Sequence, residues 1–457
     1  MTTDIPDTEG APAANQFALL RTRRFLPLFL VQFLGAFNDQ VYQKAFVALV
    51  TYRLADEVGM PVALLGVIAS ALFILPFAVI TPTAGQIADR VDKAVMMRWV
   101  KGWEIVLMIL AAIGYHTQNI YFLYFVLFLM GAQSAVFAPI KYSVLPQYLR
   151  RDELIGGNGL VQGFTFLAII FGTILGNELI LTDFGVALVS AVVIVVALAG
   201  FVASLYAPPA LPVAPEHTRP AVDWVFPRAI WRLIARCRAA PEAFRAILAI
   251  AWFWFLGATF LSLLPAYAKE ELGVDQGVLT VLLAGFSIGV AVGAIASETL
   301  TRGRIGLGLA PVAAVGLSVM AVELWLATPA VPFGTAEALL DRAAFFADAA
   351  GWRILVDFIL LAAFAGAYVT PLNAVLQAAS PDAERAQFIA CSNVVDASLM
   401  VGSAAVVAVF LAAGVQTTEV LAGLTLTGLP VAFLVARHSP ETRMGRVALA
   451  LWPRGPG

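Results

Sequence analysis

The sequence predicts an all-α integral membrane protein whose twelve transmembrane helices form two six-helix repeats. Charged residues make up 13% of the 457 residues, about half the share of an ordinary soluble domain, and hydrophobic residues make up 61%. The hydrophobic residues form continuous runs of about 20, the length that a helix needs to cross a bilayer. A polar stretch rich in proline separates six such runs from six more. A net charge of −2 and 2 Cys argue against a nucleic-acid-binding protein and a disulfide scaffold.

The apolar runs divide the chain into five regions. We predict cytoplasmic tails at 1–24 and 437–457, six-helix bundles at 25–206 and 244–436, and a cytoplasmic linker at 207–243. A periplasmic insertion is expected near 329–351. The first and seventh spans share the sequence FLGA, at Phe33–Ala36 and Phe255–Ala258, which supports a repeat. The predicted spans are 25–51, 61–88, 95–115, 120–145, 154–180, 185–206, 244–267, 278–298, 305–326, 354–377, 387–411 and 415–436.

The basic residues predict the orientation, because Lys and Arg accumulate in cytoplasmic loops. With a cytoplasmic N-terminus, 23 of the 28 Lys and Arg residues fall on the cytoplasmic side and 4 on the other, with Lys44 left inside a span. The 23 include Lys101 and Lys141. We therefore expect a multi-pass membrane protein with both termini in the cytoplasm.

The linker contains an arginine stripe. Arg228, Arg232 and Arg236 recur every four residues, with Ile230 and Trp231 on the other side. This pattern predicts a cationic amphipathic helix on the anionic inner leaflet.

The loop after the second span, from Gly85 to Lys93, has the sequence GQIADRVDK. It resembles the signature loop of the major facilitator superfamily, except that Asp92 stands where the family usually has Gly. Gly85 would let two helices approach closely. Asp89 can pair with Arg90, with Lys93 or with a neighbouring helix N-terminus. We interpret these residues as a latch that breaks and reforms as the two halves rock.

Polar residues inside the first span form a second candidate site. A charged side chain in the bilayer costs about 2.5–3.5 kcal/mol, so each one is a functional candidate. Gln32, Asp39 and Gln43 share one helical face, and Gln40 and Lys44 form an adjacent pair. Either a contact with substrate or a structural hydrogen-bond network is consistent with this face.

Other spans carry isolated polar groups. Lys141 with Tyr142, between two prolines, suits a phosphate or a lysine that extends to the interface. Four further residues are candidates for proton coupling or for structural hydrogen bonding: Glu104, Asp357, Asn393 and Asp396.

Three motifs resemble those of the bacterial lysophospholipid transporter family, whose membrane module also occurs fused to acyl-acylglycerophosphoethanolamine synthetases. They are FLGAFND at 33–39, APIKY at 138–142 and NGL at 158–160. The resemblance implies a major facilitator fold and a role in handling the headgroup for Asp39 and Lys141. One departure is Gln162, where relatives usually carry a carboxylate. The expected substrate-binding set is Asn38, Asp39, Gln43, Lys44, Lys141, Tyr142 and Gln162.

The resemblance implies a transporter or flippase that moves lysophosphatidylethanolamine-like lipids inward for reacylation by a separate acyltransferase. A carboxylate suits the ethanolamine ammonium, and a lysine suits the phosphate. The alternatives are a proton-coupled exporter of amphipathic drugs or metabolites, and a non-transporting scaffold or sensor. No His is followed by Asp five positions later, as a glycerolipid acyltransferase would require. We expect a monomer in contact with membrane lipids, with no enzymatic activity, cofactor, metal or nucleic acid.

Overall fold

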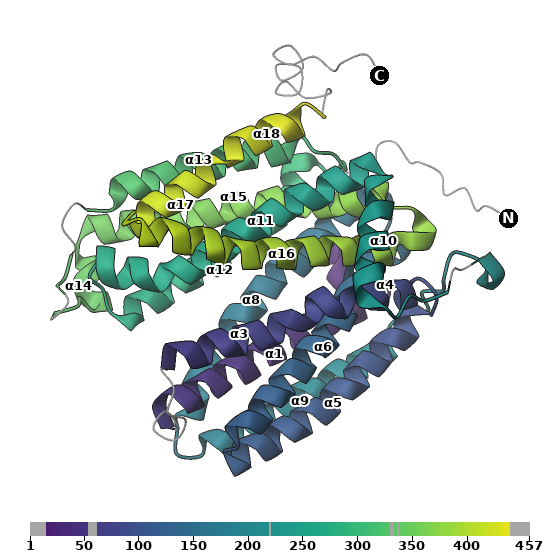
Figure 1. The fold of residues 1–457 in the computed structure, drawn as a ribbon, viewed down its shortest axis with the longest axis horizontal. Helices are drawn as coiled ribbons and strands as arrows, with labels where there is room; N and C mark the ends of the chain where they lie inside the picture. The colour runs from purple at the N-terminus through teal and green to yellow at the C-terminus, as the bar shows by residue number, and fades with distance from the viewer. Residues whose placement is uncertain (1–14, 54–61, 219–220, 330–332, 336–337, 439–457) are drawn as a thin grey trace.

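The structure is a computed structural model that describes residues 15–53, 62–218, 221–329, 333–335 and 338–438. Figure 1 shows two helix bundles, with α11–α18 in the upper half and α1–α9 in the lower half. The helices of the first bundle are α1 Leu26–Arg53, α3 Val62–Val79, α4 Thr81–Ala88, α5 Lys93–Thr117, α6 Ile120–Ser143, α7 Leu145–Tyr148, α8 Leu154–Ile180 and α9 Gly185–Leu205. After α10 Phe226–Arg238 come α11 Pro241–Ala266, α12 Gln276–Thr301, α13 Leu309–Ala327, α14 Arg342–Ala347, α15 Ala349–Ala379, α16 Arg385–Ala412, α17 Thr417–Leu426 and α18 Gly428–Ala436.

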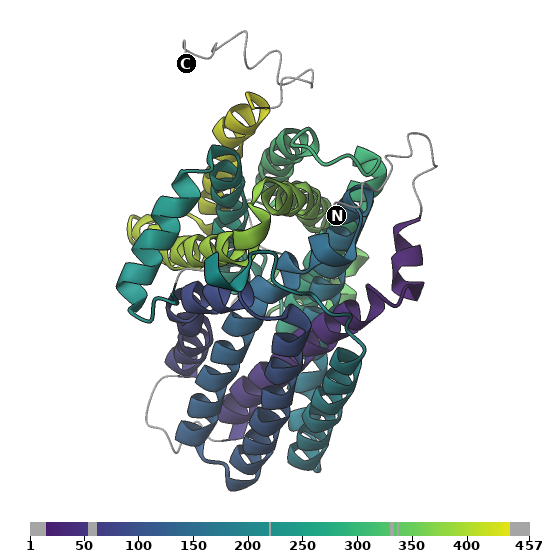
Figure 2. The same cartoon turned by 90° about the vertical axis from the view of Figure 1, so that its right-hand side faces the viewer.

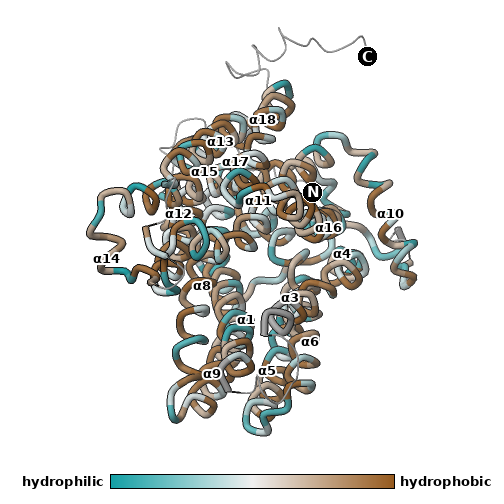
Figure 3. Tube along the Cα trace, turned by 60° about the vertical axis from the view of Figure 1, so that its left-hand side comes forward, coloured by the Kyte–Doolittle hydropathy of each residue, from teal (hydrophilic) through white to brown (hydrophobic). Residues whose placement is uncertain are grey.

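The long helices are apolar along most of their length, and hydrophilic residues gather at their ends and in α10 (Figure 3). Among the described residues, nine helices have the length and composition to cross a membrane, or ten if the bent pair of α3 and α4 is one span. Two more, α1 and α5, have 28 and 25 residues, but polar side chains lower their hydropathy. The chain is a multi-pass membrane protein, and the count of twelve spans stays a prediction.

Two predicted spans are broken rather than continuous. The span at 61–88 bends by 46° between α3 and α4, next to Ile80. The span at 415–436 divides into α17 and α18 at Thr427. The apolar pattern runs through both breaks, which is why it did not reveal them. Proline lies near each, at Pro82 and Pro430, and proline removes a helical hydrogen bond.

We call the two ends of the molecule the α10 end and the α14 end, after the short helices that mark them (Figure 1). Helix α10 contacts α4 of the first bundle and α11 and α16 of the second, at the end of the molecule that faces the viewer in Figure 2. The bundles touch closely because glycine allows backbone contact. A Cβ on Gly159 of α8 would lie 2.5 Å from the Ala294 carbonyl oxygen of α12, and one on Gly85 of α4 would lie 2.7 Å from the Ala390 Cβ of α16.

The arginines of the α10 stripe pair with protein carboxylates, and their contact with the anionic leaflet stays a prediction. Arg228 and Arg232 bind Asp223 at 2.8 and 2.9 Å. Hydrogen bonds from Arg228 hold the pKa of Asp223 below its ordinary value. Arg236 binds Glu384 of the second bundle at 3.0 Å. Helix α10 therefore ties the linker to both bundles.

Candidate functional site

A cavity of about 320 Å³ lies between the two bundles. Helices α3, α6 and α8 supply one wall, and helices α11, α12, α15 and α16 supply the other. Its surface is mainly apolar and aromatic, with a few polar groups, which is the composition expected of a site for an amphipathic molecule. The large apolar side chains that line it are Phe77, Phe166, Phe253, Trp254, Leu261, Phe286 and Met400.

The first bundle contributes three of the expected binding residues to this cavity, namely Lys141, Tyr142 and Gln162. The Lys141 ammonium lies 4.9 Å from the centre of the Tyr142 ring, within reach of a cation–π contact. The Tyr142 hydroxyl donates a 2.7 Å hydrogen bond to Gln162 Oε1. The amide at position 162, where relatives usually have a carboxylate, thus orients the tyrosine beside the lysine.

The second bundle contributes Asn393 and Asp396 of α16. The Ser392 hydroxyl donates to Asp396 Oδ2 at 3.3 Å, whereas Asp396 Oδ1 and Asn393 Nδ2 are buried with no hydrogen-bond partner among the described residues. Asp396 lies eleven residues into α16, about 16 Å along the helix and close to the middle of a bilayer. Unsatisfied polar atoms in a cavity are costly, so they indicate a place for a polar ligand group.

The polar face of α1 belongs largely to a separate network inside the first bundle. Glu104 of α5 accepts hydrogen bonds from Lys101 at 2.6 Å, Asn38 at 3.1 Å and Gln133 at 3.2 Å. The Ser134 hydroxyl donates to Asp39 at 2.7 Å.

The position of Lys101 corrects our assignment of this residue to the cytoplasmic surface. Its side chain is 1% exposed, in the third turn of α5, and forms an ion pair with Glu104. Gly35 makes room for it, because a Cβ there would lie 2.6 Å from the ammonium. The i, i+3 spacing of Lys101 and Glu104 inside one apolar run was the signal in the sequence that could have revealed the pair.

Four of the expected binding residues, Asn38, Asp39, Gln43 and Lys44, do not line the central cavity. Asn38 and Gln43 are buried, and Asn38 faces Glu104. The structure therefore separates the expected set into a cavity group from α6 and α8 and an internal group from α1.

Asp357 also lies away from the cavity, near the α14 end of α15. Four residues earlier on the same helix, Arg353 forms a 2.5 Å ion pair with Glu323 of α13. Asp357 is buried, and its Oδ2 has no hydrogen-bond partner among the described residues. This position places it closer to an outer charged cluster than to the groups of the central cavity.

The loop from Gly85 to Lys93 contacts the other bundle. Asp89 accepts hydrogen bonds from the backbone N–H groups of Ala386 and Gln387 at 2.9 and 3.0 Å. These groups open α16, so Asp89 caps the N-terminus of a helix in the opposite bundle. Lys93 is buried behind it at the start of α5. The pairing with a helix N-terminus, one of those considered from the sequence, is therefore present in the structure.

A second link between the bundles was absent from the sequence analysis. The side-chain amides of Asn158 on α8 and Gln377 on α15 bond to each other twice, at 2.8 and 2.9 Å, and both are buried. Three hydrogen-bonded links between the bundles, Gln16 to Ile295, Asn158 to Gln377 and Asp89 to α16, lie toward the α10 end. The molecule is thus closed at that end.

Acidification should favour this closed arrangement. Burial raises the pKa of Asp89 from its ordinary 3.8 to about 6, with the Ala386 and Gln387 N–H groups and Lys93 acting in the opposite direction. An Asp89 released into water would return toward 3.8, so the closed form binds the proton more tightly. Closure should gain stability as pH falls through about 6. Two spin labels are attached at Val95→Cys and Arg304→Cys, with Cys237 and Cys391 replaced by Ser. The fraction of molecules with a short distance between the labels should be larger at pH 5.5 than at pH 7.5.

The control for this measurement is Asp89→Asn, which replaces the titrating carboxyl by a neutral amide of the same shape. It should keep the short distance populated at pH 7.5 as well as at pH 5.5, because the amide resembles the protonated carboxyl, and it should reduce the pH dependence. An unchanged pH dependence in Asp89→Asn would contradict the role of this carboxyl.

Comparison with known proteins identifies relatives of this chain. It is 27% identical over 367 residues to lysophospholipid transporter LplT of Serratia proteamaculans (strain 568), covering 78% of this chain and 81% of the relative. It is 26% identical over 427 residues to lysophospholipid transporter LplT of Enterobacter sp. (strain 638), covering 92% and 95%.

Solved structures share the fold at low sequence identity. The human organic anion transporter MFSD10 (TETRAN) matches with a TM-score of 0.67 at 16% identity, covering 90% of this chain and 99% of that chain. The transporter FucP in the outward conformation matches with a TM-score of 0.65 at 15% identity, covering 91% and 99%. The family model of the Major Facilitator Superfamily matches residues 28–340. This chain, whose two packed helix bundles are joined by the hydrogen bonds of Asp89 to α16, belongs to the Major Facilitator Superfamily.

Proposed function

We propose that this transporter moves lysophospholipids, of the lysophosphatidylethanolamine type, inward across the bacterial inner membrane by alternating access. The observation that carries the proposal is the central cavity, a largely aromatic space to which the first bundle contributes Lys141 and the second contributes Asp396 from opposite walls. The names of the relatives support the same substrate class. Substrate sites between two repeats that rock on one another are the general arrangement for such transporters.

The chemistry of the cavity suits a zwitterionic lysolipid. The Lys141 ammonium would bind the phosphate, and the partly unsatisfied Asp396 carboxylate would accept hydrogen bonds from the ethanolamine ammonium. The single acyl chain would lie along the aromatic wall, which includes Phe253 and Trp254. In this proposal Asp396 replaces Asp39 as the partner of the ammonium, because Asp39 does not line the cavity. Asp39 would act through Ser134 on the shape of the first bundle.

The α10 end is assigned to the cytoplasm, because most of the Lys and Arg residues outside the spans lie at that end. Closure there supports a state that receives substrate from the α14 end, which would face the periplasm. Inward release then requires the bonds from Asp89 to α16 and the Asn158–Gln377 pair to break. A separate acyltransferase would consume the delivered lipid, and the transporter would act as a monomer without catalysing a reaction itself.

The test is lysolipid flux into proteoliposomes that contain the purified full-length protein. Inward movement of fluorescent lysophosphatidylethanolamine should exceed that into protein-free vesicles and should saturate with substrate. The alternative of a proton-coupled drug exporter predicts instead that a pH gradient drives movement of an amphipathic cation such as ethidium. Ethidium movement without lysolipid movement would overturn the proposal in favour of the exporter.

A further inference from the structure

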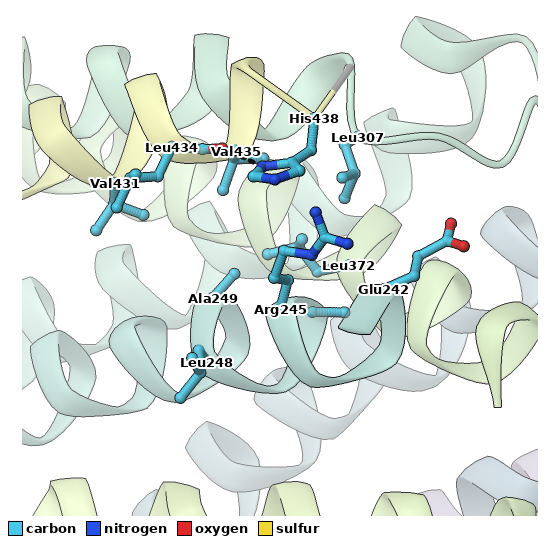
Figure 4. Close-up of a pocket in the computed structure, with 11 residues that line it drawn as sticks. Glu242, Arg245, Leu248, Ala249, Leu307, Leu372, Val431, Leu434, Val435 and His438 are labelled. Atoms are coloured by element: carbon cyan, nitrogen blue, oxygen red, sulfur yellow. Dashed lines mark hydrogen bonds between the residues drawn. The ribbon is translucent and has the colours of Figure 1, made fainter. Parts of the chain in front are cut away.

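A second and larger cavity, of about 760 Å³, lies in the second bundle at the α10 end (Figure 4). It shares no lining residue with the central cavity. We propose that this cavity binds a diacyl phospholipid of the phosphatidylethanolamine type from the leaflet at the α10 end, as a bound lipid that is not the transported substrate.

The cavity lies between α11 and α18, beyond the interruption of the helix at Thr427. The Trp252 indole of α11 donates a 2.9 Å hydrogen bond to the Thr427 hydroxyl, and a Cβ on Gly428 would lie 3.0 Å from the Trp252 ring. These contacts hold α11 against the chain at Thr427. Beyond it, α18 packs on α13, for example where Gly428 lies against Ser318, and the side chains of the described residues leave the space between α18 and α11 unfilled.

The walls of the cavity are apolar, and its rim is open to the surroundings. Ala246, Ala249 and Leu372 form its buried side. Leu248 on α11 and Leu434 on α18 are 47% and 54% exposed. Exposed leucines on two neighbouring membrane helices face lipid rather than water, so an acyl chain can enter between them.

The charged groups lie together at the end of the cavity nearest the α10 end. Figure 4 shows Arg245 of α11 and His438, which follows α18, directed toward the same space from opposite walls, with Glu242 beside them. Arg245 Nε is bonded to the Pro241 carbonyl at 2.8 Å, which directs the guanidinium along the helix toward the rim. A guanidinium with an imidazole suits a phosphate, and a carboxylate suits an amine.

The order of these groups along the cavity favours a membrane phospholipid over a water-soluble anion. Charges at the level of the headgroups followed by an apolar slot match a lipid that stands parallel to the helices. The presence of both Arg245 and Glu242 in the lining further favours a zwitterionic phosphoethanolamine headgroup. A free phosphate would leave the apolar walls, including Val431 and Leu434, without a partner.

The experiment measures lipid binding rather than transport, so its outcome does not depend on the proposed substrate. The delipidated full-length protein in detergent is titrated with 1-palmitoyl-2-oleoyl-phosphatidylethanolamine and analysed by native mass spectrometry. We expect one tightly held lipid, with apparent affinity about tenfold lower in Arg245→Ala. Val431→Trp, which fills the cavity from α18, should lose this lipid as well. The matched control is Arg304→Ala, an exposed arginine at the same end and outside the cavity, which should bind as the wild type does.

Equal lipid affinity in wild type, Arg245→Ala and Val431→Trp would overturn the proposal. Binding of lysophosphatidylethanolamine without binding of the diacyl lipid would also overturn it, because the occupant would then be the transport substrate. Thermal unfolding of each variant shows whether the fold persists, and Val431→Trp keeps the test decisive if Arg245→Ala fails to fold.

Discussion

Asp396→Asn is expected to reduce inward lysophosphatidylethanolamine flux at least tenfold while leaving the amount of folded protein unchanged. Asp396 is the only carboxylate, and Lys141 the only cation, among the described residues that line the central cavity. Hydrogen bonds to charged groups contribute about 1.5–3 kcal/mol each, which corresponds to about 10- to 150-fold in binding. Flux into proteoliposomes containing equal amounts of protein measures the effect.

The control for this prediction is Asp183→Asn, which removes one carboxylate from the exposed loop between α8 and α9. It should transport as the wild type does. Lys141→Ala should resemble Asp396→Asn, since both residues would bind the same headgroup. Wild-type flux in Asp396→Asn would remove the carboxylate from the proposed mechanism, and wild-type flux in Lys141→Ala would remove the lysine.

Lys101→Met is expected to give the largest loss of stability among single substitutions in the first bundle. The substitution leaves the Glu104 carboxylate buried among Asn38 and Gln133 without its counter-ion. Removal of one partner of a buried ion pair costs about 3–5 kcal/mol. The measurement is thermal unfolding of the purified protein, followed by size-exclusion chromatography of the heated samples.

The double variant Lys101→Met, Glu104→Gln should recover much of this loss, because it removes both charges together. Lys269→Met is the matched control. Lys269 lies just after the end of α11 and its side chain is exposed, so the protein should tolerate the change. If Lys101→Met unfolds at the same temperature as the wild type, the ion pair does not stabilise the first bundle.

The hydropathy of the sequence predicted most of the fold, because a membrane helix is specified by a local run of apolar residues. The bend at Ile80 and the interruption at Thr427 escaped prediction for the same reason, since apolar residues continue through both. Side-chain pairing is a property of several helices together. The sequence therefore drew attention to Asp39 and Asp396 but could not show that one faces Ser134 and the other a cavity.

The pairing of the two amides that join the bundles could not be predicted from the sequence either. Asn158 and Gln377 are 219 positions apart, and neither is charged, so neither the cost of burial nor a short motif marks them as partners. Lys101 was misplaced because a basic residue near a predicted helix end was counted with the loop. Its position in the third turn of α5 places it inside the bundle instead.

The close crossing of α8 and α12 has a mechanical consequence. At Gly159 and Gly163 the α8 backbone rests on the carbonyl oxygens of Ala294 and Ala291, with room for hydrogen atoms and little else. At this crossing the two bundles therefore meet through peptide groups in direct contact. A methyl group added at Gly159 or Gly163 would push the two bundles apart at the α10 end. The absence of side chains at these glycines therefore helps to set the equilibrium between the states open to either side of the membrane.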